Sequence, residues 1–273
     1  MMKNNSSTAW RTLQIAVGAI YVFMLGPILI TATVSFNASN RSLFPPQGFS
    51  LRWWSTALSP EWLEPLVFSL RLATITAVVS AALALPLAFA IARHEFSGRS
   101  VIEALTLGPL MVPSLVTGVG LLQFFEYVGW RAYIGFPALL AGHVVIAMPF
   151  AIRTIAVSLH TLPSNLERAA QSLGASDSAV LRRITLPLIK NGIVAGMVFA
   201  FIHSFTDVNL SLFLVRPGQL PVTVKILGFL EFGFAPTLAA ISVITLIVPL
   251  VLVAVVQYLT GLGDFVYGER RSA

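Results

Sequence analysis

A few ionisable and hydroxyl side chains lie inside long apolar stretches of this sequence, where such groups usually serve a function. Asp207 is the acidic residue placed deepest in an apolar run, with His203 four positions before it and Ser211 four positions after it. Together with Gly196 and Ala200 they recur every three or four positions, as residues on one face of a helix do. The stripe could line a pathway in which the Asp207 carboxylate holds a cationic amine. Alternatively, Asp207 could pair with His203 as a structural contact, and both interpretations stay open.

Other polar residues in the apolar runs permit less specific hypotheses. Glu126 could add charge to the entrance of a pathway or end a helix in solvent, and His143 is predicted to hydrogen-bond within a helix bundle. A hydrolase built from His143, His203 and Asp207 would need a nucleophile or a metal triad, and the sequence supplies only one His/Asp pair. The signatures G-x-x-x-x-G-K-[ST], H-E-x-x-H and G-x-S-x-G are absent. We therefore expect no catalytic residue, no metal site and no cofactor bound by this chain.

The composition excludes most soluble classes of protein. Of 273 residues, 56% are hydrophobic and 10% charged, and the mean hydropathy is +0.85, whereas an ordinary soluble domain is about a quarter charged. The net charge of +6 could indicate nucleic acid as a partner, but the basic residues are scattered through loops between apolar runs. That pattern is typical of orientation in a lipid bilayer. With no cysteine, the chain has neither disulfides nor thiolate metal sites.

Six apolar runs are long enough to cross about 30 Å of hydrocarbon, which takes roughly 20 residues. They predict an all-α integral membrane protein that forms a single transmembrane domain over residues 1–273. The first run follows Lys3 and Arg11 as a signal peptide would, but it is too long for one, and we expect an uncleaved span. The spans are predicted near 12–36, 65–92, 102–126, 134–157, 188–214 and 236–260.

The distribution of Lys and Arg predicts how these spans are oriented. Alternate loops divide the 17 basic residues into a set of eleven, which includes both chain ends, and a set of six. Because excess positive charge stays on the cytoplasmic side, both termini are expected inside. The segments 37–64, 127–133 and 215–235 then face outward, and the connection between the fourth and fifth spans is cytoplasmic.

That connection, residues 160–187, reads as a pair of short helices. Leu162, Leu166, Ala169, Ala170 and Leu173 form one apolar stripe at helical spacing. Gly174 then supplies a left-handed helix cap, and a second helix runs from near Ser176 to Pro187. Such an element exposes an apolar ridge to the cytoplasm. It could lie on lipid headgroups, an interpretation that explains its amphipathic character but not its glycine-capped break.

The spacing within this connection resembles the "EAA" loop, E-A-A-x3-G-x9-I-x-L-P, of the permease subunits of binding-protein-dependent ATP-binding-cassette (ABC) importers. The family's glutamate position holds Arg168 in this chain, and Glu167 precedes it by one residue. The segments SFNASNRSLFPPQGFSLRWW, ARHEFSGRS and SFTDVNLSLFLVRPGQLPVTVKI are similar to the second permease of spermidine/putrescine importers. The matching motif residues are Ala169, Ala170, Gly174, Ile184, Leu186 and Pro187.

The resemblance implies a type I importer permease fold with six transmembrane helices and cytoplasmic coupling helices. It implies an importer that moves a small solute by alternating access across a bacterial inner membrane, and spermidine or putrescine leads as the substrate. An opine, a phosphonate, iron or another small amine is the alternative, and a stand-alone channel would need no coupling motif. The implied partners are an ATPase dimer that binds ATP and Mg, a second permease in a heterodimer, a periplasmic solute-binding protein and lipid, but no nucleic acid.

In this family the coupling loop contacts the ATPase subunit, which requires an apolar ridge, small residues for close approach and a glycine-shaped corner. The residues to which the resemblance assigns this contact are Glu167, Arg168, Ala169, Ala170, Leu173, Gly174, Ile184, Leu186 and Pro187.

Helix breakers and small residues give two further expectations. Pro109 and Pro113 should interrupt the third span, Pro149 the fourth and Pro249 the sixth, and such interruptions often lie beside a cavity. Small residues four apart give faces for close helix packing. These faces carry Ala73, Ala77 and Ala81 in the second span, and Gly192 and Gly196 in the fifth.

Overall fold

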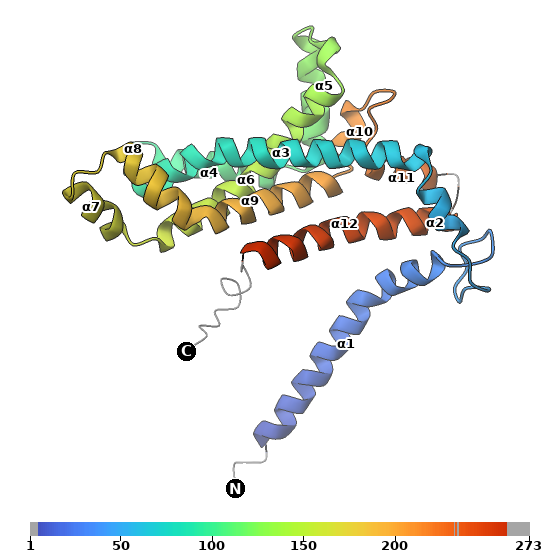
Figure 1. Ribbon diagram of the computed structural model, residues 1–273. Coiled ribbons are helices and arrows are strands. Elements are labelled where there is room, and N and C mark those ends of the chain that lie inside the picture. Colours follow the sequence, from blue (N-terminus) through green and yellow to red (C-terminus); the bar gives the residue numbers. More distant parts are fainter. Residues whose placement is uncertain (1–4, 232, 234, 261–273) are drawn as a thin grey trace. The chain divides into compact units, whose positions relative to one another are not determined.

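The computed structural model describes residues 5–231, 233 and 235–260, and its regular structure is helical apart from isolated bridges (Figure 1). Within these residues, five helices are long and apolar enough to cross a membrane, or six if one bent pair counts as a single span. The all-α fold with membrane-spanning helices is therefore confirmed. Lys3, Arg270 and Arg271, which contributed to the orientation argument, lie outside the described residues.

The chain divides into two compact units. The first, here the N-terminal unit, comprises Met1–Leu63 and Ile226–Ile247, and the second, here the central unit, comprises Glu64–Lys225 and Val248–Ala273. The single domain over residues 1–273 stays a prediction. The coupling loop and the residues of the predicted pathway all belong to the central unit.

Three helices lie side by side in the central unit: α3 (Pro60–Arg93), α6 (Phe136–Thr161) and α9 (Leu186–Thr206) (Figure 1). Small residues let them approach closely. A Cβ atom on Gly192 would lie 2.1 Å from Ser158 Oγ, and one on Gly196 would lie 2.7 Å from Thr154 Oγ1. The prediction that the glycine face of the fifth span packs tightly is thus confirmed, and its neighbour is α6. A buried core joins the three helices through Ala84, Ala88, Ile91, Ala151, Ile152, Ile155, Leu159, Leu162 and Ile189.

Helix α3 contains an uncharged run whose length matches a bilayer. Arg71 and Arg93 are separated only by the apolar and small polar residues from Leu72 to Ala92. At 1.5 Å per residue this run is about 31 Å long, close to the ~30 Å thickness of the hydrocarbon layer. Arg93, the last residue of α3, therefore marks the expected cytoplasmic border of the membrane.

The third predicted span is bent. Helices α4 (Arg99–Met111) and α5 (Ser114–Tyr127) meet at an angle of 101°. The break occurs at Pro113, because the residue before a proline avoids helical geometry and Val112 is extended. The interruption at Pro113 is confirmed, whereas α6 and α12 (Pro236–Thr260) continue through Pro149 and Pro249. The expectation that these two prolines interrupt their spans was wrong, and Pro109 likewise lies inside α4.

The fifth span is shorter than predicted. Helix α9 ends at Thr206 rather than near residue 214, and Asp207 has an extended backbone. The chain then forms the short helices α10 (Ser211–Leu214) and α11 (Val222–Leu230). The run 188–214 is apolar enough to resemble one continuous span, but the local hydrogen bonds of Asp207 end the helix, as described below.

The N-terminal unit contains α1 (Asn5–Val34), α2 (Arg52–Ala57) and an ordered segment between them. Buried Asn37 organises that segment: its Oδ1 accepts from the amides of Ser39 and Gln47 at 3.0 and 2.9 Å, and its Nδ2 donates to the carbonyl of Arg41. Phe36 stacks between Phe49 and Trp54. This segment is the first of those whose sequence resembles polyamine permeases, and a single asparagine determines much of its conformation.

Candidate functional site

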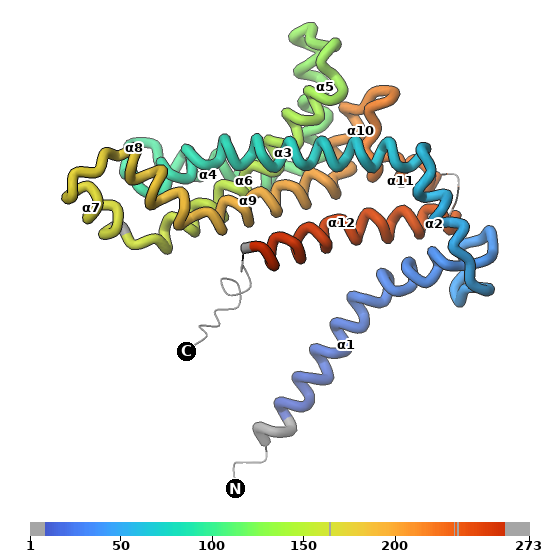
Figure 2. The backbone as a smooth tube through the Cα atoms, in the orientation of Figure 1, coloured from blue at the N-terminus to red at the C-terminus, as the bar shows by residue number. Residues whose placement is uncertain are grey.

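The predicted pair of short helices forms the turn between α6 and α9 at one end of the central unit (Figure 2). Helix α7 (Ser164–Ser172) ends in a Schellman motif, in which the amide of Gly174 donates to the carbonyl of Gln171 and that of Ala175 to the carbonyl of Ala170. Gly174 has φ +88°, which L side chains rarely adopt, and a Cβ atom at this position would meet no atom within 4 Å. Gly174 is therefore required for its backbone angle and not for space, as the predicted cap demands.

The second short helix continues directly into the fifth span. Ser176 caps α8 (Asp177–Val180), a π turn η2 (Leu181–Thr185) follows, and α9 starts at Leu186. Pro187 explains the π turn: it has no N–H to donate to the carbonyl four residues earlier, and its ring crowds that carbonyl, so the hydrogen-bond pattern shifts. Helices α8, η2 and α9 therefore form one uninterrupted helical backbone.

The helical corner presents an apolar ridge that no segment of the described chain covers. The side chain of Leu173 is 90% exposed and that of Leu166 is 45% exposed, and Ala169 is exposed between them. These three residues are here called the α7 ridge. Ala170 is only half-buried, with Ile184 and Leu186 also partly buried and Leu186 packed on the core of α3, α6 and α9. Of the nine predicted coupling residues, four are thus partly buried, and the other five, which include Ala169 and Leu173 of the ridge, are exposed.

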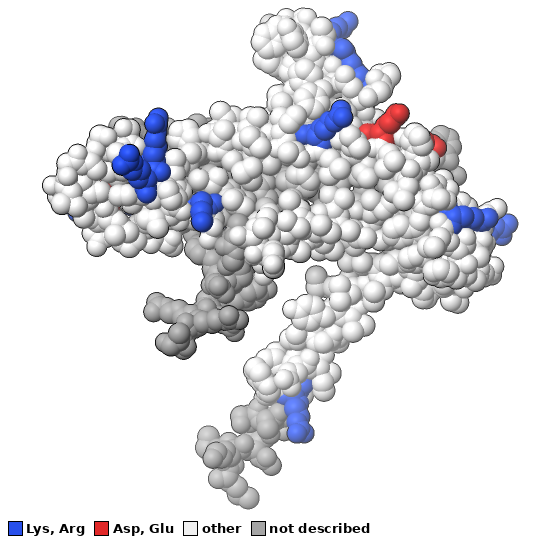
Figure 3. Space-filling view, viewed as in Figure 1, with Lys and Arg blue, Asp and Glu red and all other residues white. Residues whose placement is uncertain are grey.

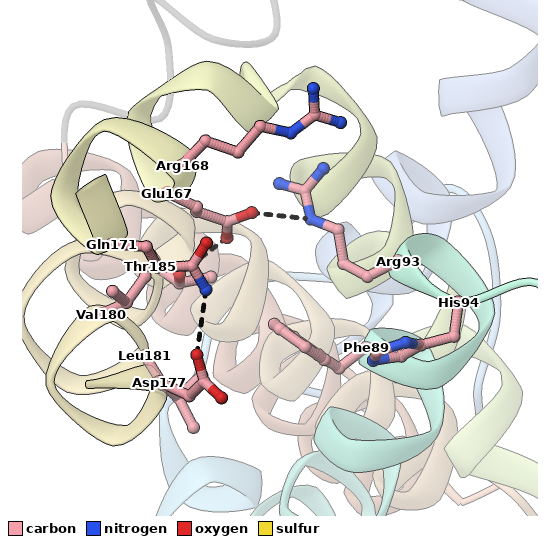
Figure 4. A pocket seen from close by; sticks show the side chains of 10 residues that line it. All are labelled: Phe89, Arg93, His94, Glu167, Arg168, Gln171, Asp177, Val180, Leu181 and Thr185. Carbon is pink, nitrogen blue, oxygen red and sulfur yellow. Dashed lines mark hydrogen bonds and ion pairs between the residues drawn. The ribbon is translucent and has the colours of Figure 1, made fainter. Parts of the chain in front are cut away.

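Glu167 and Arg168 point to different surroundings, although they are adjacent in sequence (Figure 4). Glu167 Oε2 lies 3.3 Å from Arg93 Nε, and Glu167 Oε1 accepts from the hydroxyl of Thr185 at 2.8 Å. Arg93 also donates to the carbonyl of Leu162 at 3.2 Å. The three-residue set Arg93, Glu167 and Thr185, here called the Arg93 network, joins α3, α7 and η2. Sequence reasoning missed Arg93 and Thr185, and only the position of Arg93 at the end of an apolar run hinted at a role.

A cavity of about 410 Å³ lies beside this network, at the C-terminal end of α3. Arg93, Glu167 and Arg168 line it together with His94, Gln171 and Asp177, as Figure 4 shows. Gln171 donates to the Asp177 carboxylate at 2.9 Å, which links α7 to α8. The Arg168 guanidinium forms no ion pair within the described residues and is exposed. Arg168 therefore occupies the motif's glutamate position as an unpaired positive charge.

The predicted polar stripe of the fifth span does not form one helical face. Asp207 caps α10, because its Oδ1 accepts from the amides of Leu210 and Ser211 at 3.1 and 3.3 Å and from the Ser211 hydroxyl at 3.4 Å. His203 instead packs its ring 4.8 Å from the ring of Phe150. Of the two interpretations that the sequence left open, the structural pairing of Asp207 with His203 has no hydrogen bond or ion pair among the described residues, because the helix ends between them at Thr206.

Buried hydrogen bonds connect this break to α6. His143 is 1% exposed, and its ring nitrogens lie 2.7 Å from Ser204 Oγ and 2.9 Å from Ser211 Oγ. The expectation that His143 hydrogen-bonds within the bundle is confirmed. Ser204 was not recognised from the sequence, where a lone serine in an apolar run gives no signal. Ser211 thus joins His143 to Asp207, and the three side chains hold the α9–α10 break in place.

Glu126 lies near the end of α5 and forms an ion pair with Arg131, which starts the short helix η1 (Arg131–Tyr133). Arg216 donates to the carbonyls of Arg131 and Ala132, and Gln219 Oε1 accepts from the amide of Phe136 at 2.6 Å. The segments 127–133 and 215–235, both predicted to face outward, are therefore tied together, and Glu126 contributes through its ion pair with Arg131.

The comparison with known families and proteins agrees with the helical architecture and the motif. Residues 82–261 match the family described as "Binding-protein-dependent transport system inner membrane component". The chain is 31% identical over 240 residues to the spermidine/putrescine transport system permease protein PotC of Escherichia coli K12, covering 88% of this chain and 90% of that protein. It is 30% identical to the PotC protein of Haemophilus influenzae, covering 88% and 93% of the two chains. It is 28% identical to the putrescine transport system permease protein PotI of Escherichia coli K12, covering 87% and 85%.

Solved structures support the same fold. A chain of a bacterial ABC transporter involved in the import of alginate superposes with a TM-score of 0.71 at 17% identity, covering 93% of this chain and 96% of that one. A second structure of the bacterial alginate transporter, in complex with an alginate-bound periplasmic protein, gives a TM-score of 0.69. This protein belongs to the family of inner-membrane permease components of binding-protein-dependent ABC import systems.

Proposed function

We propose that this chain is one membrane subunit of an ATP-driven importer of polyamines, and that α7 is the element through which an ATPase subunit drives it. The observation that carries the proposal is the Schellman-capped corner between α7 and α8, because it presents the α7 ridge to solvent and continues through η2 into α9. An element that projects from the membrane and is built into a spanning helix can convert the movement of a docked partner into movement of that span.

The expected partners follow from the family. A permease component hydrolyses no ATP, so that reaction belongs to a separate subunit, here an ATPase dimer that binds ATP and Mg. A second permease, different in sequence, would complete the membrane channel, and a periplasmic solute-binding protein would deliver the substrate. In this arrangement both termini and α7 are cytoplasmic, and the loop of Glu126 faces the periplasm.

Polyamines are the proposed substrate on two grounds. Three relatives that cover most of this chain are named for spermidine or putrescine transport. In addition, Phe124, Phe125, Trp130 and Tyr133 form edge-to-face contacts at the end of α5, with ring centroids 6.0 to 6.2 Å apart. Aromatic faces attract cationic amines, so this cluster suits a solute that carries several ammonium groups. Asp207 is assigned no substrate contact, because its carboxylate caps α10.

Uptake of labelled spermidine into cells that carry the complete transporter tests the proposal. We expect uptake that requires this chain and a hydrolysis-competent ATPase, and that is competed by unlabelled spermidine and putrescine. Competition instead by an opine, a phosphonate, iron or another amine would overturn the polyamine assignment. Transport by this chain alone, without an ATPase, would overturn the importer mechanism itself.

A further inference from the structure

The charge around the α7 ridge carries an inference about the surface that covers it. Its acidic neighbours are already engaged: Glu167 by Arg93 and Thr185, and Asp177 by Gln171. The basic side chains are not, since Arg168, Arg182 and Arg183 are exposed and form no ion pair within the described residues. Lys and Arg side chains gather over α8 on the face shown in Figure 3. The same helical corner therefore presents the apolar α7 ridge and, on α7 and η2, three exposed arginines that form no ion pair within the described residues.

Such a surface could face anionic lipid or an acidic protein, and the length of the helix favours protein. The stretch Asp177–Thr206 is helical over 30 residues, which corresponds to about 45 Å, whereas the hydrocarbon layer is ~30 Å thick. If Thr206 lies at the outer border, about 15 Å of helix projects on the inner side. The headgroup layer on each side is only about 5–8 Å thick. With Thr206 placed at that border, the tip that carries Leu173 stands clear of the headgroups.

The composition of the ridge points the same way. A helix that lies in a membrane interface usually buries aromatic residues such as Trp and Phe in addition to Leu. The α7 ridge offers two leucines and an alanine, and no aromatic residue occurs in α7. A small residue between two leucines permits close approach by a protein groove, into which the 90% exposed Leu173 would insert.

We propose that the groove receiving α7 has an apolar floor and an acidic rim, with partner carboxylates opposite Arg168, Arg182 and Arg183. This inference rests on the proposed function, in which the partner is the ATPase subunit. Arginine and carboxylate form bidentate, charge-assisted hydrogen bonds, so an acidic rim would fix the register of α7 in the groove. The position that holds a glutamate in the motif thus carries a positive charge in this chain, and that charge would face a carboxylate of the rim.

Cross-linking in the assembled transporter tests the docking and the charge separately. The natural chain has no cysteine, so a Leu173→Cys variant carries a single thiol. A maleimide-to-photoreactive linker on that thiol should capture the ATPase if α7 docks there. In a second variant, Arg168→Lys, a water-soluble carbodiimide should join the new ammonium to a carboxylate of the ATPase, and mass spectrometry would identify that residue.

An association measurement supplies the magnitude. We expect Arg168→Glu to weaken binding of the ATPase to the permease in lipid nanodiscs by tenfold or more, and to flatten its dependence on salt. Arg168→Lys should bind within about threefold of the natural chain. Arg41→Glu, at an exposed arginine of the N-terminal unit, is the control for the change in net charge and should leave binding unaltered.

The outcomes distinguish the two proposals. In one outcome, Leu173→Cys captures the ATPase, but Arg168→Lys gives no carbodiimide product and Arg168→Glu binds as well as the natural chain. This outcome would overturn the acidic rim and leave the proposed function intact. Capture of lipid but no ATPase from Leu173→Cys would overturn both. Binding lost equally in Arg168→Glu and Arg168→Lys would also contradict the acidic rim, because a lysine retains the charge.

Discussion

Replacing Arg93 by alanine tests whether the Arg93 network holds α7 to the membrane helices. Arg93 Nε lies 3.3 Å from Glu167 Oε2, and the side chains are 16% and 15% exposed, so the ion pair is largely withdrawn from water. The substitution would leave Glu167 with the Thr185 hydroxyl as its remaining partner. It would also free the carbonyl of Leu162, where the chain leaves α6 for α7.

The expected cost follows from the burial of this pair. Removing one partner of a buried ion pair costs about 3–5 kcal/mol, whereas an exposed pair contributes up to ~1 kcal/mol. Because the pair is partly exposed and the Thr185 bond persists, we expect Arg93→Ala to cost about 2–3 kcal/mol. At ~1.4 kcal/mol per tenfold, this shifts the equilibrium between attached and released α7 by roughly 30- to 140-fold.

Hydrogen exchange on the purified permease measures this shift at the amides of α7, and the ratio of solute transported to ATP hydrolysed measures its effect on coupling. We expect faster exchange in α7 and a lower ratio for Arg93→Ala. A double-mutant cycle with Glu167→Gln should give a coupling energy above about 1 kcal/mol. The control is Arg99→Ala, which removes the more exposed Arg99–Glu103 pair of α4, at 34% and 43% exposure, and should change stability by under about 0.5 kcal/mol.

Two results would refute this reasoning. Equal effects of Arg93→Ala and Arg99→Ala would mean that burial of the Arg93 pair contributes nothing. Strictly additive effects of Arg93→Ala and Glu167→Gln would mean that the two side chains do not interact in the membrane.

Three further substitutions have outcomes that follow from local geometry. Gly174→Ala should lower the stability by about 1–2 kcal/mol through its left-handed backbone angle, and it should reduce the solute transported per ATP. Gly129→Ala, at φ +77° and with equal free space, should lower the stability as much but leave coupling intact. Loss of coupling in both variants would contradict a specific role for the corner. Gly192→Ala places a Cβ atom 2.1 Å from a serine oxygen of α6 and should lower the melting temperature. Gly108→Ala, whose Cβ atom would meet no atom within 4 Å, should leave the melting temperature unchanged. Equal melting temperatures of the two variants would argue against close packing of α9 on α6. Asp207→Asn should retain uptake because an amide oxygen still caps α10. Asp207→Ala removes that cap and should lower the stability by about 1 kcal/mol. Abolished uptake with normal stability in Asp207→Asn would instead assign the carboxylate to the substrate.

The sequence alone determined the features that depend on local chemistry. Long uncharged runs require helices in a bilayer, because no water is present there to satisfy backbone amides and carbonyls. The corner at Gly174 follows equally from local rules, since a glycine after an amphipathic helix supplies the left-handed residue of a Schellman motif. The break at Pro113 agrees with the restriction that proline places on the residue before it, but α6 and α12 continue through Pro149 and Pro249, so a proline alone does not specify where a span breaks.

Only the tertiary structure decided how polar side chains pair. Arg93 and Glu167 lie far apart in sequence, and no periodicity links a residue at the end of one span to a residue in a later loop. The sequence did not reveal that α9 ends before Asp207, because a carboxylate placed four residues from a histidine suits a continuous helix equally well. In the folded chain it accepts from backbone amides of α10 and ends α9 instead. The physical reason is that a polar group withdrawn from water takes whichever partner the packed helices bring near, and sequence spacing specifies that partner only within one unbroken helix.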